Sequence, residues 1–135
     1  KNIGDLTIKA HDAGFPYNYL WTFSFEIIQG EKVLYFESHV DKPSRIKQND
    51  LKADCAILTT EEVKILGLLP LSNSSETTLE ILKELECKNI MIQGSDPAET
   101  KGLISYFLKI GKENLGVFKS NNINVYKDPG SEVII

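Results

Sequence analysis

Residues 20–60 constrain the fold of this chain more than any other stretch, because they hold three apolar runs separated by polar segments. Residues 20–28 alternate apolar and polar side chains, and the turn Gln29–Lys32 leads from them into a second apolar run, Val33–Glu37. Two such runs around a short Gly-containing turn predict a β-hairpin. A period of two directs one face of the first strand into a core. That face carries Trp21, Phe23, Phe25 and Ile27.

The third run, Cys55–Leu58, is continuously apolar, as is typical of a strand buried on both faces. Helix and strand patterns alternate after it, so the sequence predicts one layered α/β domain over residues 1–135, a mixed sheet with helices on one face. We expect a short helix at Thr60–Leu66 and a longer one at Glu76–Glu86, whose buried stripe is Leu79, Leu82 and Leu85. A third helix is expected to begin at the capping box of Asp96 and to end near Ile110. Further strands are expected at Ile3–Ala10, Asn89–Gln93, Leu115–Lys119, Asn124–Tyr126 and Val133–Ile135.

Composition limits the classes of partner. The formal net charge is −4 and the basic residues are scattered, which disfavours nucleic-acid binding. We interpret the small group Lys42, Arg45 and Lys47 as a solvated loop. No apolar run approaches the ~20 residues that cross a bilayer, so no membrane partner is expected. The two cysteines, Cys55 and Cys87, predict neither a disulfide framework nor a Cys-based metal site, and a reducing cytoplasm is the expected location.

The candidate metal ligands lie in two loops. His11 leaves a strand beside Asp12, which could orient its ring. Glu37, His39 and Asp41 stand at alternate positions, so an extended loop would direct all three side chains the same way. Side chains of these types bind zinc, iron or manganese. The alternative reading makes both segments ordinary polar loops without a ligand role.

Taken in order, the strands and helices resemble the C-terminal half of a metallo-β-lactamase αββα sandwich. Residues 5–14 resemble the superfamily's strand and loop that carry a ligand histidine, which falls on His11. Residues 23–36 resemble its hairpin, residues 51–58 its "lkgaDvlil" strand, residues 75–93 its helix and strand, and residues 124–135 its closing strands. The resemblance covers nearly the whole chain and implies that fold.

Departures from the family pattern concern the metal site. The His-x-His-x-Asp-His motif is absent. The bridging aspartate of the family falls on Ser38, where Glu37, His39 and Asp41 are the neighbours that could substitute, and the last ligand histidine falls on Gly94 or Ser95. Zinc needs three or four ligands at fixed geometry. The resemblance therefore implies a degenerate domain, with no cofactor in this chain as it stands.

Two functions follow from these observations, and they leave open whether the chain is an enzyme. In the first, the domain serves in binding or assembly. Half of a metallo-β-lactamase-like sandwich would leave exposed a sheet face with residues such as Trp21, Phe23, Phe25 and Ile57, and this face would form a homo-oligomer or take a protein partner. In the second, the chain is the C-terminal part of a metal-dependent hydrolase, with its main ligands upstream of Lys1; the chain does not begin with Met, which fits processing or a longer protein. A weaker third reading, a nucleotide-binding strand–helix unit over residues 54–108, lacks a Gly-rich phosphate loop.

Overall fold

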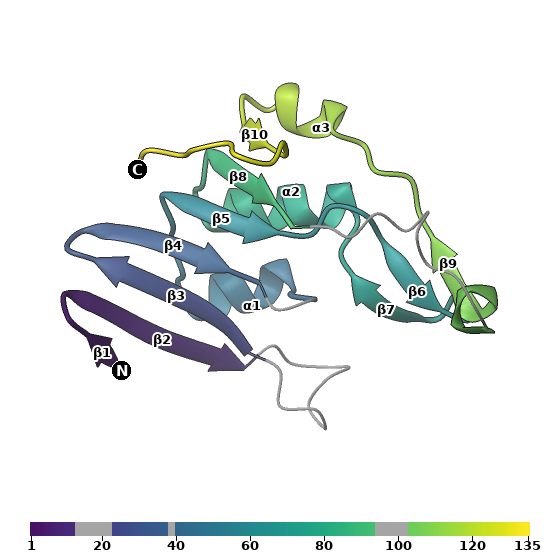
Figure 1. Ribbon diagram of the computed structural model, residues 1–135, viewed down its shortest axis with the longest axis horizontal. Coiled ribbons are helices and arrows are strands. Elements are labelled where there is room, and N and C mark those ends of the chain that lie inside the picture. The colour runs from purple at the N-terminus through teal and green to yellow at the C-terminus, as the bar shows by residue number, and fades with distance from the viewer. Residues whose placement is uncertain (13–22, 38–39, 94–102) are drawn as a thin grey trace.

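The computed structural model describes residues 1–12, 23–37, 40–93 and 103–135, and shows a seven-stranded sheet, a separate three-stranded sheet and three α-helices (Figure 1). In chain order the elements are β1 Asn2–Ile3, β2 Leu6–Asp12, β3 Phe23–Gln29, β4 Lys32–Phe36, α1 Pro43–Gln48, β5 Cys55–Leu58, β6 Val63–Ile65, β7 Leu69–Ser72, α2 Ser75–Glu84, β8 Asn89–Ile92, the 3₁₀ helix η3 Leu103–Phe107, β9 Leu108–Ile110, α3 Gly116–Lys119 and β10 Asn124–Tyr126. No helix in these ranges is long and apolar enough to cross a bilayer.

The main sheet has the order β1-β2-β3-β4-β5-β8-β10. Strands β1 to β4 pair antiparallel, and β4, β5, β8 and β10 run parallel to one another. The predicted hairpin is confirmed, with Gly30 at a positive φ in its turn, a conformation that glycine adopts without strain. The predicted mixed sheet with helices on one face is confirmed as well.

The hydrophobic core lies between one face of the main sheet and the helices. Ala56, Leu58 and Ile90 project from the sheet into this core, and Ile46 of α1 and Phe118 of α3 meet them. Helix α2 begins at the cap Ser74, whose side chain accepts a hydrogen bond from the Thr77 N–H at 3.3 Å. The stripe predicted for this helix is shifted: Leu82 and Leu85 are fully buried, as are Thr78 and Ile81, whereas Leu79 is half-buried.

The other face of the main sheet, which we call the open face, is apolar but incompletely buried. Directly paired residues lie on the same face of a sheet, and the register joins Phe25 to Phe36, Phe36 to Ile57 and Ile57 to Met91. The half-buried apolar side chains of the open face are Ile8, Phe23, Phe25, Ile27, Leu34, Phe36, Ile57 and Met91.

This arrangement corrects the interpretation of β3. The aromatic side chains share one face as predicted, but it is the opposite, polar face that is the more deeply buried: Ser24 is 0% exposed and Glu26 8%. Trp21, which was expected beside Phe23, lies outside the described residues. Apolar and polar side chains do alternate along β3, but the polar face is the one that packs into the protein, because α1 covers it.

Four other predictions at the secondary-structure level are wrong. The helix expected at Thr60–Leu66 is the strand β6, which pairs with β7 and β9 in the small sheet. The helix expected up to Ile110 ends as η3 and then β9, and its predicted cap at Asp96 lies outside the described residues. Residues 115–119 form the short helix α3 and no strand, and Val133–Ile135 is not paired as a strand.

Candidate functional site

A buried polar cluster lies where β3 begins and β4 ends, next to α1. Its centre is Asp41, which is 1% exposed and stands two residues before the helix. Both carboxylate oxygens accept a hydrogen bond from Arg45, Oδ1 from Nε at 2.8 Å and Oδ2 from Nη2 at 2.7 Å. This two-pronged contact is the strongest geometry for an arginine–carboxylate pair. It forms at i and i+4 because Pro43 starts the helix between the two residues.

Three further donors converge on the same carboxylate. Ser24 Oγ donates to Oδ2 at 2.8 Å, the Tyr35 hydroxyl donates to Oδ2, and the Lys42 N–H donates to Oδ1 at 2.7 Å. Burial, and then the charge of Asp41, raise the pKa of Tyr35 far above its ordinary value, so this hydroxyl stays a donor. Burial opposes the Arg45 charge, but the hydrogen bonds and charge of Asp41 outweigh it and raise the pKa of Arg45.

Glu37 forms the second half of the cluster and joins four segments of the chain. Its Oε1 accepts from the Asp41 N–H at 3.0 Å and from Asn73 Nδ2, which also donates to the Asp41 carbonyl at 3.1 Å. Its Oε2 accepts from the Thr59 N–H and hydroxyl, both at 3.1 Å. Burial raises the pKa of Glu37 to about 8, although the bonds from Thr59 and the Asp41 N–H lower it. Every oxygen of Glu37 and Asp41 thus already has protein donors.

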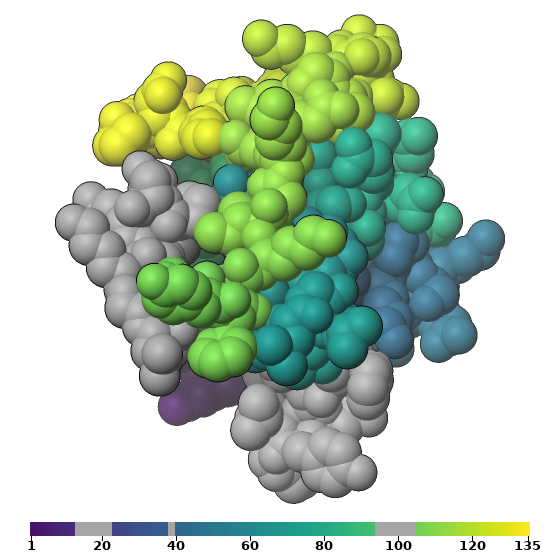
Figure 2. All heavy atoms as spheres, turned by 90° about the vertical axis from the view of Figure 1, so that its right-hand side faces the viewer, coloured from purple at the N-terminus to yellow at the C-terminus, as the bar shows by residue number. Residues whose placement is uncertain are grey.

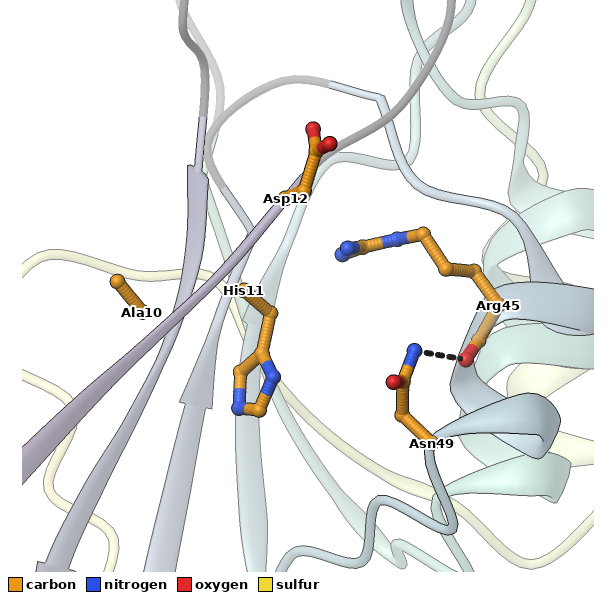
Figure 3. Close-up of a pocket in the computed structure, with 5 residues that line it drawn as sticks. All are labelled: Ala10, His11, Asp12, Arg45 and Asn49. Carbon is orange, nitrogen blue, oxygen red and sulfur yellow. Dashed lines mark hydrogen bonds between the residues drawn. The ribbon is translucent and has the colours of Figure 1, made fainter.

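His11 lies at the end of β2 and pairs with a carboxylate of the neighbouring strand. Its Nε2 lies 2.7 Å from Oε2 of Glu26, and both side chains are largely buried. Figure 3 shows His11 and Asp12 on one side of an open pocket of about 320 Å³, with Arg45 and Asn49 of the α1 region on the other. The pocket is therefore lined by one member of each ion pair, His11 and Arg45.

The predicted metal ligands are distributed as follows. Glu37 and Asp41 are hydrogen-bonded neighbours in the buried cluster, His11 belongs to the adjacent pair, and His39 lies outside the described residues. Within the ranges that the structure describes, no three His, Cys, Asp or Glu side chains are grouped so that they could hold a metal ion. The structure brings Glu37 and Asp41 together through donors and not around a shared open centre.

Sequence reasoning missed five members of the cluster, Ser24, Tyr35, Arg45, Thr59 and Asn73. The sequence predicts a solvated loop around Arg45, and this prediction is wrong: the Arg45 side chain is only 15% exposed because it pairs with Asp41. The Asp41/Arg45 spacing of four was the available signal. Ser24 and Tyr35 could be found only from the pairing of β3 with β4, and Asn73 only from the position of β7, so no local pattern contained them.

The chain resembles solved structures, whereas no family model and no curated protein sequence matches it. CmlA, a diiron β-hydroxylase from Streptomyces venezuelae, superposes with a TM-score of 0.64 at 12% identity, over 94% of this chain and 31% of CmlA. The metallo-β-lactamase fold protein YhfI from Bacillus subtilis gives 0.61 at 12% identity, over 95% and 48%. A putative Zn-dependent hydrolase of the metallo-β-lactamase superfamily from Thermotoga maritima gives 0.55 at 11% identity, over 94% and 67%.

These likenesses confirm the predicted metallo-β-lactamase-like fold. The chain spans less than half the length of CmlA and of YhfI.

Proposed function

We propose that this chain is a degenerate metallo-β-lactamase-like domain that acts in binding or assembly, with the open face of its main sheet as the contact surface. The observation that carries the proposal is the uneven cover of that sheet: helices bury one face, and the opposite face holds a continuous set of half-buried aromatic and aliphatic side chains. Phe25 stands at its centre, with its ring 6.5 Å from those of Phe23 and Phe36. Contiguous apolar surface of this kind marks a contact site.

The state of the carboxylates supports the degenerate reading. A carboxylate that binds a metal needs an oxygen lone pair directed at the ion. The oxygens of Asp41 and Glu37 instead accept hydrogen bonds from backbone N–H groups and from the side chains of Arg45, Ser24, Tyr35, Thr59 and Asn73. Exchange of those partners for a metal would leave the buried Arg45 guanidinium without its counter-charge, which is costly. We therefore assign these two carboxylates a structural role.

Native mass spectrometry of protein purified without chelators tests the proposal, because it reports subunit count and bound metal together. We expect a metal-free dimer, or a mass that includes a partner. The variants Phe25→Thr and Ile27→Thr, which keep a strand-forming residue, should shift the dimer toward monomer, whereas Ile134→Thr, at a side chain that is 96% exposed, should not. A stoichiometric zinc, iron or manganese ion would overturn the assignment.

One observation favours a second candidate function, the C-terminal part of a metal-dependent hydrolase whose main ligands lie upstream. The Glu26 carboxylate holds one ring nitrogen of His11, as carboxylates do behind metal-ligating histidines, and His11 lines the pocket. In that case the metal would supply hydroxide from water at neutral pH. His11→Ala would then lower the metal content of the protein that contains the upstream half, and unchanged content would exclude His11 as a ligand.

A further inference from the structure

An exposed apolar prominence stands at the end of the small sheet, away from the cluster and the open face. It consists of the β6–β7 turn and the end of η3, which the Leu66 N–H joins by donating to the Phe107 carbonyl at 2.6 Å. Leu66 is 66% exposed, Leu68 84%, Tyr106 86% and Phe107 48%. Figure 1 places β6, β7 and β9 at one end of the long axis, and Figure 2 looks onto this end, where the teal hairpin and the green η3–β9 segment lie together.

The turn departs from what folding alone would favour. Leu66 and Gly67 both have positive φ, at 52° and 70°, and the Leu68 N–H donates to the Ile65 carbonyl at 3.0 Å. Such a hairpin turn is favoured by Asn-Gly, since a leucine in the left-handed region is strained. The chain thus places a leucine in a strained backbone conformation at a position where about two-thirds of the residue is exposed. A leucine at a positive φ that gains little packing in return is a sign that the position serves a function.

The charge around the prominence indicates what it meets. The segments 63–72 and 103–112, which build the small sheet and its tip, contain three lysines and no acidic residue, although the chain as a whole carries −4. Lys64 and Lys109 are direct cross-strand partners on one face, an unfavourable juxtaposition of like charges. Glu62 pairs with Lys64 at 2.8 Å, and in the described part of the chain neither Lys109 nor Lys112 has an ion-pair partner.

We propose that this prominence, Leu66, Leu68, Tyr106 and Phe107, docks on an anionic lipid surface, with Lys109 and its cross-strand partner Lys64 beside it. Two leucines at a convex tip enter the acyl region, a tyrosine and a phenylalanine suit the headgroup boundary, and lysines next to them meet anionic headgroups. A protein partner would need a groove that matches this protruding tip, whereas a bilayer can accept the tip without one. The expectation of no membrane partner came from the lack of a spanning segment, and peripheral docking needs none.

Vesicle co-sedimentation of the 135-residue chain tests the proposal. We expect binding to phosphatidylcholine vesicles that contain phosphatidylserine, weaker binding to phosphatidylcholine alone, and a decline with added salt. The double variant Leu66→Asn/Leu68→Asn should weaken binding roughly a hundredfold, about tenfold for each leucine. Asn suits the left-handed position of Leu66, so this variant should fold at least as well as the parent protein. Lys109→Glu should reduce binding to the anionic vesicles only.

Ile134→Asn serves as the matched control, because it removes an exposed aliphatic side chain elsewhere and should leave binding unchanged. The proposal is overturned if the parent protein does not bind anionic vesicles, or if the double leucine variant binds as well as the parent. It is also overturned if the leucine variant disperses a self-associated form while neither protein binds vesicles, since the prominence would then contact protein. None of these outcomes depends on the open face.

Discussion

Removal of the Asp41 carboxylate should cost more stability than any other single truncation of a surface or loop carboxylate in this chain. Asp41→Ala leaves the Tyr35 and Ser24 hydroxyls, both at 0% exposure, without their shared acceptor, and it leaves the Arg45 guanidinium unpaired at 15% exposure. Breaking a buried ion pair by removing one partner costs about 3–5 kcal/mol. That is a fifth or more of the roughly 5–15 kcal/mol that stabilises a typical domain, and it corresponds to a fall of about 10–18 °C in Tm.

Urea unfolding followed by far-UV circular dichroism measures this loss, and a double-mutant cycle identifies its cause. Arg45→Met alone should also destabilise strongly, because it leaves Asp41 as an unpaired buried anion. The double variant Asp41→Ala/Arg45→Met removes both charges, so it should cost less than the sum of the single variants by about 2 kcal/mol or more.

The exposed pair Lys52–Glu86 provides the control. Its nitrogen and oxygen are 2.6 Å apart, closer than in the Asp41 pair, but both side chains are largely in water. Glu86→Ala should leave stability unchanged within error, because solvent screens such pairs. If Asp41→Ala cost under 1 kcal/mol, or if the two single effects simply added, the cluster would not be the buried, coupled unit described above.

Three further predictions concern other parts of the fold. Burial raises the pKa of Glu37 to about 8 from an ordinary 4.5, so the contribution of protonated Glu37 to stability is complete below about pH 4.5 and declines as pH rises to about 8. The urea midpoint of the parent protein should therefore fall across this pH window relative to the midpoint of Glu37→Gln. Parallel pH profiles of the two proteins would refute the raised pKa. Cys87 is 2% exposed and burial raises its pKa to about 11, so thiol reagents should label it only at the rate of unfolding; fast labelling of native protein would contradict this. Ser74→Ala removes the cap of α2 and should cost about 1 kcal/mol in urea unfolding, whereas Ser74→Asp should cost almost nothing.

The elements that sequence predicted correctly are those whose signal is local. The β3–β4 hairpin has its glycine turn, β5 and β8 are short apolar runs, and α2 has a serine cap and a helical stripe. In each case neighbouring residues alone specify the backbone conformation.

The small sheet escaped prediction because its turn carries the wrong residue for its conformation. An Asn-Gly pair would have indicated a hairpin between Val63 and Ser72, but Leu66-Gly67 reads as the end of a helix that starts at Thr60. Helix α3 has four residues, too few for a helical period to be visible. Strand β9 is formed by pairing with β6, about 45 residues earlier in the chain, and no local pattern encodes that partner.

The inverted faces of β3 show the deeper limit. A period of two establishes which side chains share a face, but it identifies the buried face only if polar side chains stay in water. Here Ser24 and Glu26 are buried because partners from elsewhere satisfy them, Asp41 and Arg45 from the α1 region and His11 from β2. Because the helices and the polar cluster cover the polar face of the sheet, the aromatic face is the one that remains for another layer of protein to cover. The buried polar cluster and the apolar open face are therefore two consequences of one choice of face, which is why disrupting Asp41 should affect folding while substitution of Phe25 should affect association.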